Sequence, residues 1–270
     1  MKLGCGTVLF NQLDLYGALQ HIAWAGYQGV ELACMAGMAQ HIELNTSPSY
    51  IDEVKAAVKK HGLELFAIEA FFGAKPDDEK IKLMTKVFDV AGKLNIPVVA
   101  VRSEGKTGDK QATGQVISYL GKLSKQAESR GIKIAVKPHV GHSFHNTETL
   151  LQLLNEVNSP ALGVNLDSSN FYRDGDDPAE AVTKLGSKIF HAHIRDTTLD
   201  KNQGRTPLDI QIAGRGVLDW PNILGSLKAV GYQGALNTQI IGAFTSPLSV
   251  QMGIAAEARG YLNRCLQTLH

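Results

Sequence analysis

The chain has 270 residues, of which 44% are hydrophobic and 20% charged, and its formal net charge is +1 at pH 7. That length suits one large α/β domain with a sizeable core. The balanced charge, with no block of one sign, argues against nucleic acid or an anionic membrane as a partner. No apolar run approaches the roughly 20 residues of a membrane span. The three cysteines are few and far apart, so we expect no disulfide framework and a cytoplasmic location.

Strand-like runs alternate with helical patterns along the whole chain, the strands beginning near residues 2, 29, 64, 97, 133, 161, 188 and 234. Apolar residues recur at helical spacing between them. Predicted helix starts are Asp14, Pro48, Asp77 or Asp78, about Thr113, Thr147, Pro178, Pro221 and about Pro247. The eightfold alternation predicts a single (β/α)8 barrel formed by residues 1–270 as one domain, rather than a doubly wound sheet.

Polar side chains end several of the predicted strands. In a (β/α)8 barrel the active site lies at the carboxyl ends of the strands, so these residues are the candidates for function. The candidates in the three most polar segments are Lys137, His139 and His142, then Asp167 and Asn170, and then His191 and His193. Further strand-end candidates are Glu31, Glu69, Arg102, Glu104 and Gln239. Arg215, in the long loop 197–219, is a candidate for holding an anionic group of a substrate.

Five segments, taken in order and spacing, resemble the xylose-isomerase-like TIM-barrel superfamily. They are residues 25–32, 165–170, 191–196, 214–220 and 229–234. That superfamily holds sugar epimerases, ketose isomerases, inosose dehydratases and endonuclease IV. The resemblance implies a small sugar or polyol-derived substrate, and it is compatible with a homo-oligomer.

The resemblance also implies a divalent metal, held by Glu, Asp, His and Glu side chains at the ends of the fifth to eighth strands. The Asp and His correspond to Asp167 and His193, but the two glutamates correspond to Lys137 and Gln239. A protonated lysine offers no lone pair and repels a cation, and glutamine lacks the charge. Mn²⁺ or Mg²⁺ is therefore disfavoured, no cofactor is firmly predicted, and Zn²⁺ held by additional histidines stays open.

The first functional hypothesis is an isomerase or epimerase that transfers a proton next to a carbonyl group. Lys137 would stabilise the enolate-like oxygen, and Glu31 or a histidine such as His193 would move the proton. Asp167 and His193 would hold substrate hydroxyls or a residual metal. We also expect the ammonium of Lys137 to lie within salt-bridge distance of Asp167 and to replace part of the metal's charge. The remaining substrate-binding candidates are His139, His142, Asn170, His191, Gln239 and Arg215.

Two alternatives stay open on the sequence. Lys137 could form a Schiff base with a carbonyl substrate in a lyase or aldolase. The loss of both glutamates could instead mark a non-catalytic sugar-binding homologue. A DNA-repair activity like that of endonuclease IV is disfavoured, because the chain lacks the carboxylates of a multi-metal cluster and the positive charge that binds phosphate backbones.

Overall fold

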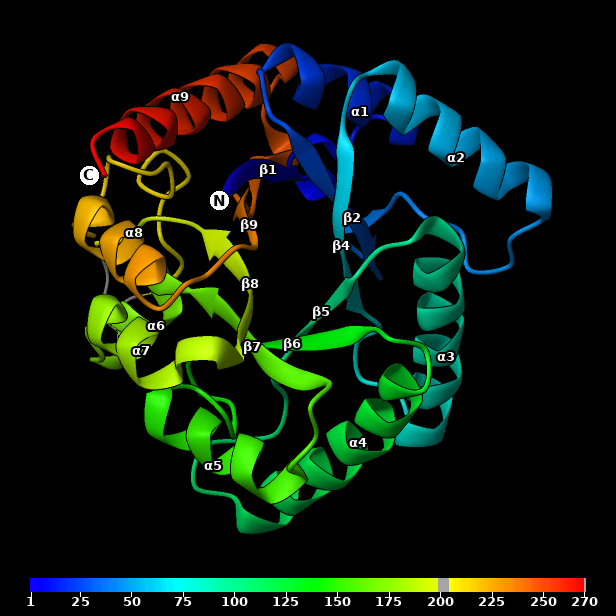
Figure 1. Ribbon diagram of the computed structural model, residues 1–270, viewed down its shortest axis with the longest axis vertical. Coiled ribbons are helices and arrows are strands. Elements are labelled where there is room, and N and C mark those ends of the chain that lie inside the picture. The colour runs from blue at the N-terminus through cyan, green and yellow to red at the C-terminus, as the bar shows by residue number, and fades with distance from the viewer. Residues whose placement is uncertain (199–203, 270) are drawn as a thin grey trace.

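The computed structural model describes residues 1–198 and 204–269. Eight parallel strands form a closed barrel, in which β1 pairs with both β2 and β9. Figure 1 looks along the barrel, with the helices arranged in a ring around the strands. The barrel strands are β1 Lys2–Gly6, β2 Gly29–Met35, β4 Glu64–Phe71, β5 Val98–Arg102, β6 Lys133–Lys137, β7 Leu162–Asp167, β8 Ile189–Ile194 and β9 Ala235–Thr238. The predicted (β/α)8 barrel is confirmed.

The helices follow the predicted order, and most begin within one residue of the predicted positions. The exception is α4, which begins at Lys110 after the cap Asp109, before the predicted start at about Thr113, while α5 begins at Thr147 with Asn146 as its cap. The helices are α1 Leu15–Trp24, α2 Pro48–Lys60, α3 Asp77–Leu94, α4 Lys110–Glu128, α5 Thr147–Val157, α6 Ser168–Asp174, α7 Pro178–Leu185, α8 Trp220–Ala229 and α9 Leu248–Gln267. None of these helices, in the part of the chain that the structure describes, is long and apolar enough to cross a membrane.

Short elements that the periodicity did not predict lie at the strand ends. They are β3 (Ala39–Gln40), which pairs antiparallel with β2, the helix α6, and three 3-10 turns, η1 (Thr7–Phe10), η2 (Gly186–Lys188) and η3 (Ala243–Thr245). Each is shorter than the windows in which hydrophobic periodicity can be recognised. The helix α6 is nevertheless functionally placed, because it begins directly after Asp167.

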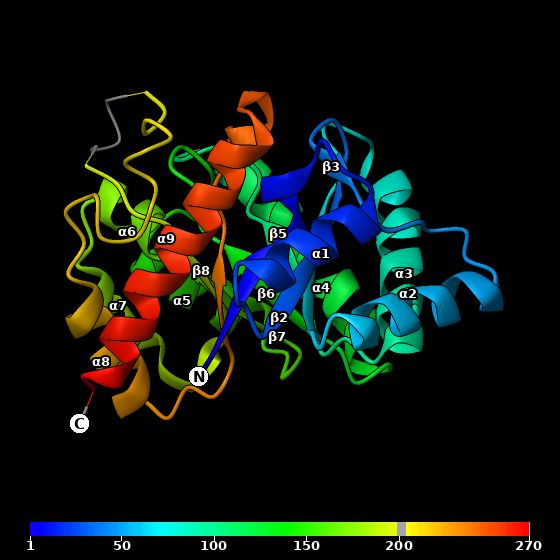
Figure 2. The ribbon, with the colours of Figure 1, turned by 90° about the horizontal axis from the view of Figure 1, so that it is seen from above.

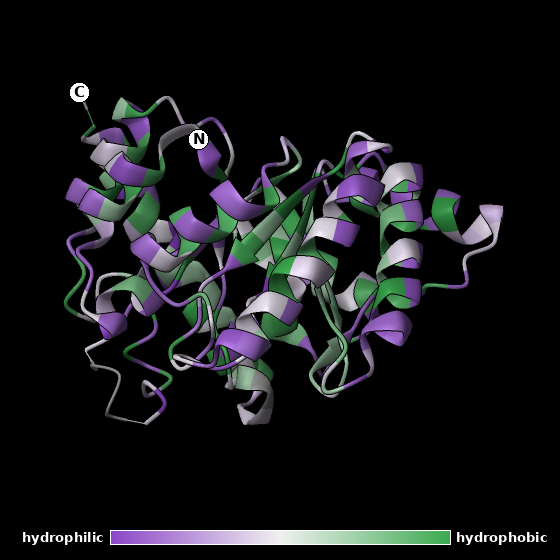
Figure 3. Ribbon diagram, turned by 90° about the horizontal axis from the view of Figure 1, so that it is seen from below, coloured by the Kyte–Doolittle hydropathy of each residue, from purple (hydrophilic) through white to green (hydrophobic). Residues whose placement is uncertain are grey.

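The N-terminal end of the barrel is closed by two phenyl rings that pack against glycines. A Cβ atom added at Gly29 would lie 2.5 Å from the ring of Phe66, and one added at Gly163 would lie 2.5 Å from the ring of Phe190. Both approaches are too close for any side chain, so glycine is required at both positions. Hydrophobic residues dominate the strands at the centre, while hydrophilic residues colour the outer faces of the helices (Figure 3). The polar site must therefore lie at the opposite end, above this apolar plug.

Both termini lie at the end of the barrel opposite to the loop that contains residues 204–219 (Figure 2). That loop is anchored by Asp196, a completely buried carboxylate directly after β8. Asp196 accepts hydrogen bonds from the backbone N–H of Thr197 (2.9 Å), Gly214 (2.9 Å) and Leu218 (3.2 Å), and from Trp220 Nε1 (2.9 Å). Asp196 therefore holds the loop to the end of the barrel.

We expect Asp196→Asn to destabilise the protein by about 2 kcal/mol, because the amide removes the charge and turns an N–H group toward donors that need an acceptor. The free energy of unfolding in urea measures this. Asp209→Asn, at an exposed position of the same loop, is the matched control. Equal stability of the two variants would contradict the anchoring role.

Candidate active site at the barrel mouth

A cavity of about 330 Å³ opens at the carboxyl ends of the strands. Its lining includes side chains from β4, β5 and β6, from α6, and from the segments that follow β8 and β9. The polar and charged residues among the described lining are Glu69, Arg102, Lys137, His139, Asn170, Arg173, Arg195, Arg205, Thr206 and Gln211. Lys137, His139 and Asn170 were predicted to lie at this mouth, and they line the cavity.

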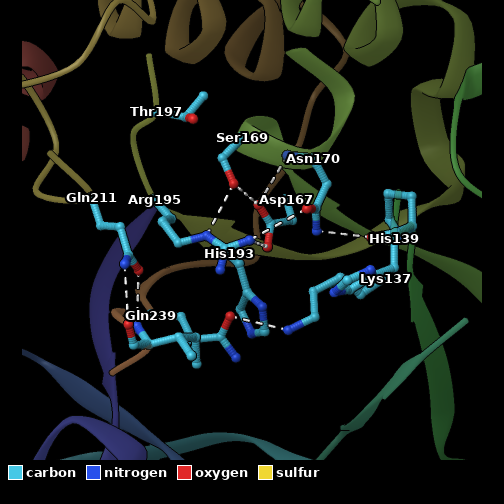
Figure 4. Close-up of polar contacts among 12 residues, drawn as sticks. Lys137, His139, Asp167, Ser169, Asn170, His193, Arg195, Thr197, Gln211 and Gln239 are labelled. Atoms are coloured by element: carbon cyan, nitrogen blue, oxygen red, sulfur yellow. Dashed lines mark hydrogen bonds and ion pairs between the residues drawn. The ribbon is translucent and has the colours of Figure 1, made fainter. Parts of the chain in front are cut away.

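The ammonium group of Lys137 lies at the base of the cavity between two acceptors. Lys137 Nζ donates to Glu69 Oε1 at 2.6 Å and to Gln239 Oε1 at 3.0 Å. The amide of Gln239 in turn donates to Glu69 Oε2, which closes a ring of three side chains. The bond between Lys137 and Gln239 is drawn in Figure 4. The expected salt bridge from Lys137 to Asp167 is wrong, because Glu69 takes that place.

Asp167 is held by Arg195, the residue that follows β8. Arg195 Nη2 lies 2.9 Å from Asp167 Oδ2, and Ser169 Oγ donates to Asp167 Oδ1 at 2.6 Å (Figure 4). Burial alone raises the pKa of Asp167, but the positive charges of Arg195, Lys137 and His193 and the Ser169 bond more than offset it, so the pKa lies below its usual value. Asp167 is therefore a buried carboxylate bound to an arginine.

Glu31 and two histidines form a second cluster, buried in the barrel. His193 Nε2 lies 2.9 Å from Glu31 Oε2, and His191 Nε2 lies 3.0 Å from Glu31 Oε1 but is poorly aligned for a hydrogen bond. Asn237 Nδ2 donates to Glu31 Oε2 at 2.8 Å. Burial raises the pKa of Glu31, but the two imidazoles outweigh it and hold the pKa far below the usual range.

The three residues of this cluster were candidates for catalysis or substrate binding at the mouth. Glu31, His191 and His193 are at most 1% exposed, and none of them lines the mouth cavity. His191 instead borders a hollow at the N-terminal end of the barrel, beside Phe66 and Phe190. Glu31, predicted as a proton carrier, and His191, predicted as a substrate ligand, therefore lie outside the lining of the mouth cavity.

His139 and His142 stack on one another beside the cavity, with ring centroids 4.6 Å apart. His139 Nδ1 lies 3.2 Å from the carbonyl of Val140, and His142 Nδ1 is hydrogen-bonded to the carbonyl of Ser103. Burial lowers the pKa of His139 to about 4, and the positive charges of Arg102 and Lys137 act in the same direction. His139 is therefore a neutral imidazole at neutral pH, with Nε2 as its acceptor.

This lowered pKa predicts a loss of stability in acid. The unfolded chain binds a proton on His139 near pH 6.5 and the folded chain only near pH 4, so stability falls as the pH decreases through this window. His139→Asn should reduce that loss by about 2 kcal/mol, measured as the difference in unfolding free energy between pH 6.5 and pH 4. His61→Asn is the control. If the unfolding free energy of His139→Asn fell between pH 6.5 and pH 4 as much as that of the wild type, the attribution of this loss to His139 would be refuted.

Arg215 is not part of the mouth. It is about half exposed and forms a salt bridge with Glu257 of α9, with 2.5 Å between Arg215 Nε and Glu257 Oε1. It therefore lies outside the cavity at which it was predicted to hold an anionic group. The sequence did not identify Arg195, Arg173 and Arg205 as site residues, although Arg195 directly follows a strand and could have been found from that position.

The four positions that hold the divalent metal in the resemblance do not fit a cation here. Lys137 carries a positive charge into the site, Asp167 is bonded to Arg195, and Gln239 is bonded to Glu69 and Lys137. His193 is directed to Glu31. The donor groups are thus engaged with one another or with cations, and a divalent ion would have to displace these bonds.

Among the described residues, one group of histidine and acidic side chains brings its ligand atoms within 4.8 Å of one another, namely Glu31, His191 and His193. Two imidazoles and a carboxylate suit Zn²⁺ better than Mg²⁺. His193 and Asn237 already bond to Glu31, His191 Nε2 has no hydrogen-bond partner in the described part of the chain, and none of these side chains lines the mouth cavity.

Known proteins resemble this chain in sequence and in fold. A family model described as xylose isomerase-like TIM barrel matches residues 19–246. An inosose isomerase of Halalkalibacterium halodurans is 26% identical over 259 residues, which is 92% of this chain and 90% of that protein. An inosose dehydratase of Geobacillus thermodenitrificans is 21% identical over 257 residues, covering 85% and 81% of the two chains.

Two solved structures with the same fold include one that contains zinc. A D-tagatose 3-epimerase-like protein has a TM-score of 0.79 and 21% identity, covering 100% of this chain and 98% of its own. The IOLI protein with a bound zinc atom has a TM-score of 0.78 and 22% identity, covering 97% and 98% of the two chains. At this identity the two structures establish the fold alone.

Proposed function

Because this chain belongs to the xylose isomerase-like TIM-barrel family, we propose that it is a sugar isomerase- or epimerase-like enzyme. The reaction is proton transfer at the carbon next to a carbonyl of a small polyhydroxylated substrate. The observation that carries the proposal is the ring of Glu69, Lys137 and Gln239 at the base of the mouth cavity. It joins a carboxylate base to a positively charged donor within one site.

Each member of the ring has a separate task in this proposal. Glu69 removes the proton from the carbon, since a carboxylate has further lone pairs beside those that accept from Lys137 and Gln239. The ammonium of Lys137 donates to the substrate oxygen and stabilises the enolate that develops there. Gln239 orients Glu69. Return of the proton to the former carbonyl carbon gives the isomer once the proton of the adjacent hydroxyl group has moved to the former carbonyl oxygen. His139, a neutral imidazole at the cavity wall, carries this second proton.

The contacts of Lys137 favour proton transfer over Schiff-base chemistry. Its nitrogen donates to two acceptors, as a protonated ammonium does, and in this form it has no lone pair with which to attack a carbonyl. The lyase alternative therefore needs a neutral lysine, which these contacts do not favour.

Deuterium wash-in tests the proposal without knowledge of the product. The purified protein is incubated in D₂O with inosose, D-tagatose and D-allulose, and deuterium incorporation is followed by NMR. We expect exchange at a carbon next to the carbonyl and no covalent adduct after borohydride. Trapping of Lys137 by borohydride would favour the lyase, and binding without exchange would favour the non-catalytic homologue.

We further propose that the family's divalent metal is not used, because of the charge of Lys137. Exchange should therefore survive chelators unchanged. Lys137→Glu with Gln239→Glu should create a metal site, seen as a rise of about 5 °C or more in Tm with Mn²⁺, because a ligand that binds only the folded state stabilises it. The wild type should show little shift. Chelator-removable zinc that is needed for exchange would contradict this, and would direct attention to Glu31, His191 and His193.

A further inference from the structure

The mouth cavity is strongly cationic. Of the described residues that line it, five carry a positive charge and one, Glu69, is a carboxylate. The five are Arg102, Lys137, Arg173, Arg195 and Arg205. A site that only binds a neutral polyol has no use for such an excess, because hydroxyl groups are bound equally well by amides and carboxylates.

Two of the cations are already neutralised by carboxylates. Lys137 forms its salt bridge with Glu69, and Arg195 forms one with Asp167. Arg173 donates to the carbonyl of Gly204 at 2.9 Å, so it also serves to hold the loop over the cavity. The positive charge that binds a ligand must therefore come from another residue that lines the cavity.

Arg102 is the best placed source of that charge. It ends β5 and pairs in register with Lys137 on β6, so it lies next to the reactive ring. Its guanidinium stacks on Phe71 with 4.1 Å to the ring centroid, which fixes its plane. Among the described residues it forms no salt bridge, and its Nε is buried without a hydrogen-bond partner.

The carboxylates near Arg102 are bonded to other cations. Glu69 and Glu104 both act on it electrostatically, but Glu69 is bonded to Lys137 and Glu104 to Lys80, at 2.5 Å. Arg102 is partly buried, and a guanidinium whose buried part lacks a counter-ion is costly in a folded protein unless a ligand supplies one. Its flat fork of N–H groups matches a carboxylate or phosphate.

We propose that the substrate of this site carries an anionic group, a carboxylate or a phosphate, which binds to Arg102 with Arg205 as a second, exposed contact. This rests on the proposed function, because it places the anionic group beside the carbonyl that faces Lys137 and Glu69. The chain would then act on a sugar acid or a sugar phosphate in preference to a neutral sugar.

Anion binding can be tested separately from turnover. The wild-type protein is titrated with inorganic phosphate and with acetate at constant ionic strength in chloride, and binding is followed by calorimetry and by Tm. We expect saturable binding of at least one anion, weakened about tenfold or more in Arg102→Gln. Arg130→Gln, which removes an arginine on the outside of the barrel, is the control and should bind as the wild type does.

The outcomes separate the two anions and the two proposals. Preference for phosphate supports a sugar phosphate, and preference for acetate supports a sugar acid. No saturable binding, or equal binding by wild type and Arg102→Gln, overturns the proposal. If Arg102→Gln does not fold, Arg205→Gln at the exposed loop position makes the same comparison. Failure of deuterium exchange with intact anion binding would reject the reaction and keep the anion site.

Discussion

Glu69→Gln is expected to slow deuterium exchange into the substrate by about 10²–10⁴-fold, which is the contribution of a positioned general base. Glutamine has nearly the same shape and can still accept from Lys137, so the fold should be retained. The amide cannot take a proton from carbon. The variant should be less stable than the wild type, because the buried ammonium of Lys137 loses its counter-ion. The rate of wash-in measured by NMR under saturating substrate, at a temperature at which circular dichroism shows the variant to be fully folded, isolates the effect on the reaction.

Glu104→Gln is the matched control for that experiment. Glu104 lies just beyond the end of β5 and is bonded to a lysine, Lys80, as Glu69 is bonded to Lys137. It is not among the residues that line the mouth cavity. Its replacement should leave the exchange rate within about twofold of wild type. Retention of more than a tenth of the wild-type rate by Glu69→Gln would remove Glu69 from the reaction.

Lys137→Met should be the most destabilising of the proposed single substitutions, at about 3–5 kcal/mol, because it leaves the carboxylate of Glu69 buried without its cation. The side chains of Lys137 and Glu69 are only 7% and 5% exposed. Adding Glu69→Leu should recover most of that loss, since well-packed apolar residues can replace a buried ion pair at little cost. Urea unfolding of the single and double variants measures the coupling.

Lys2→Met supplies the comparison. It breaks the salt bridge between Lys2 and Glu64, in which both side chains are about half exposed, and exposed pairs contribute about 0–1 kcal/mol. If Lys137→Met costs no more than Lys2→Met, the ring at the base of the cavity is not the structural unit described here. If the double variant is as unstable as the single one, the loss comes from packing rather than charge.

The order of the elements and the location of the site could be predicted from the sequence by itself. Apolar periodicity and strand-end polarity depend on residues close together in the chain, so the barrel and its carboxyl-end mouth follow from local patterns. The same reasoning placed Lys137, His139 and Asn170 at the mouth, where the structure has them. It also indicated that His191 and His193 point to the inside, because alternate residues of a strand share a face.

The depth of each side chain in the barrel was decided only by the tertiary structure. The alternation of side chains along a strand indicates that Glu31 points into the barrel. Its position along the barrel axis depends on how neighbouring strands are aligned. The register of β2 against β4 shifts between Val30 and Glu31, and that of β7 against β8 shifts between Val164 and Asn165. These shifts depend on side-chain packing across strands distant in sequence, and no local pattern encodes them.

The partners of the charged groups were decided in the same way. The sequence determined that Lys137 and Asp167 end adjacent strands, and opposite charge made them an expected pair. In the folded barrel Glu69, two strands away on the other side, reaches Lys137 instead, and Arg195 takes Asp167. Long flexible side chains that converge at the mouth can each reach several partners. The partner is selected by the geometry of the whole mouth and by the cost of burying a charge without a counter-ion.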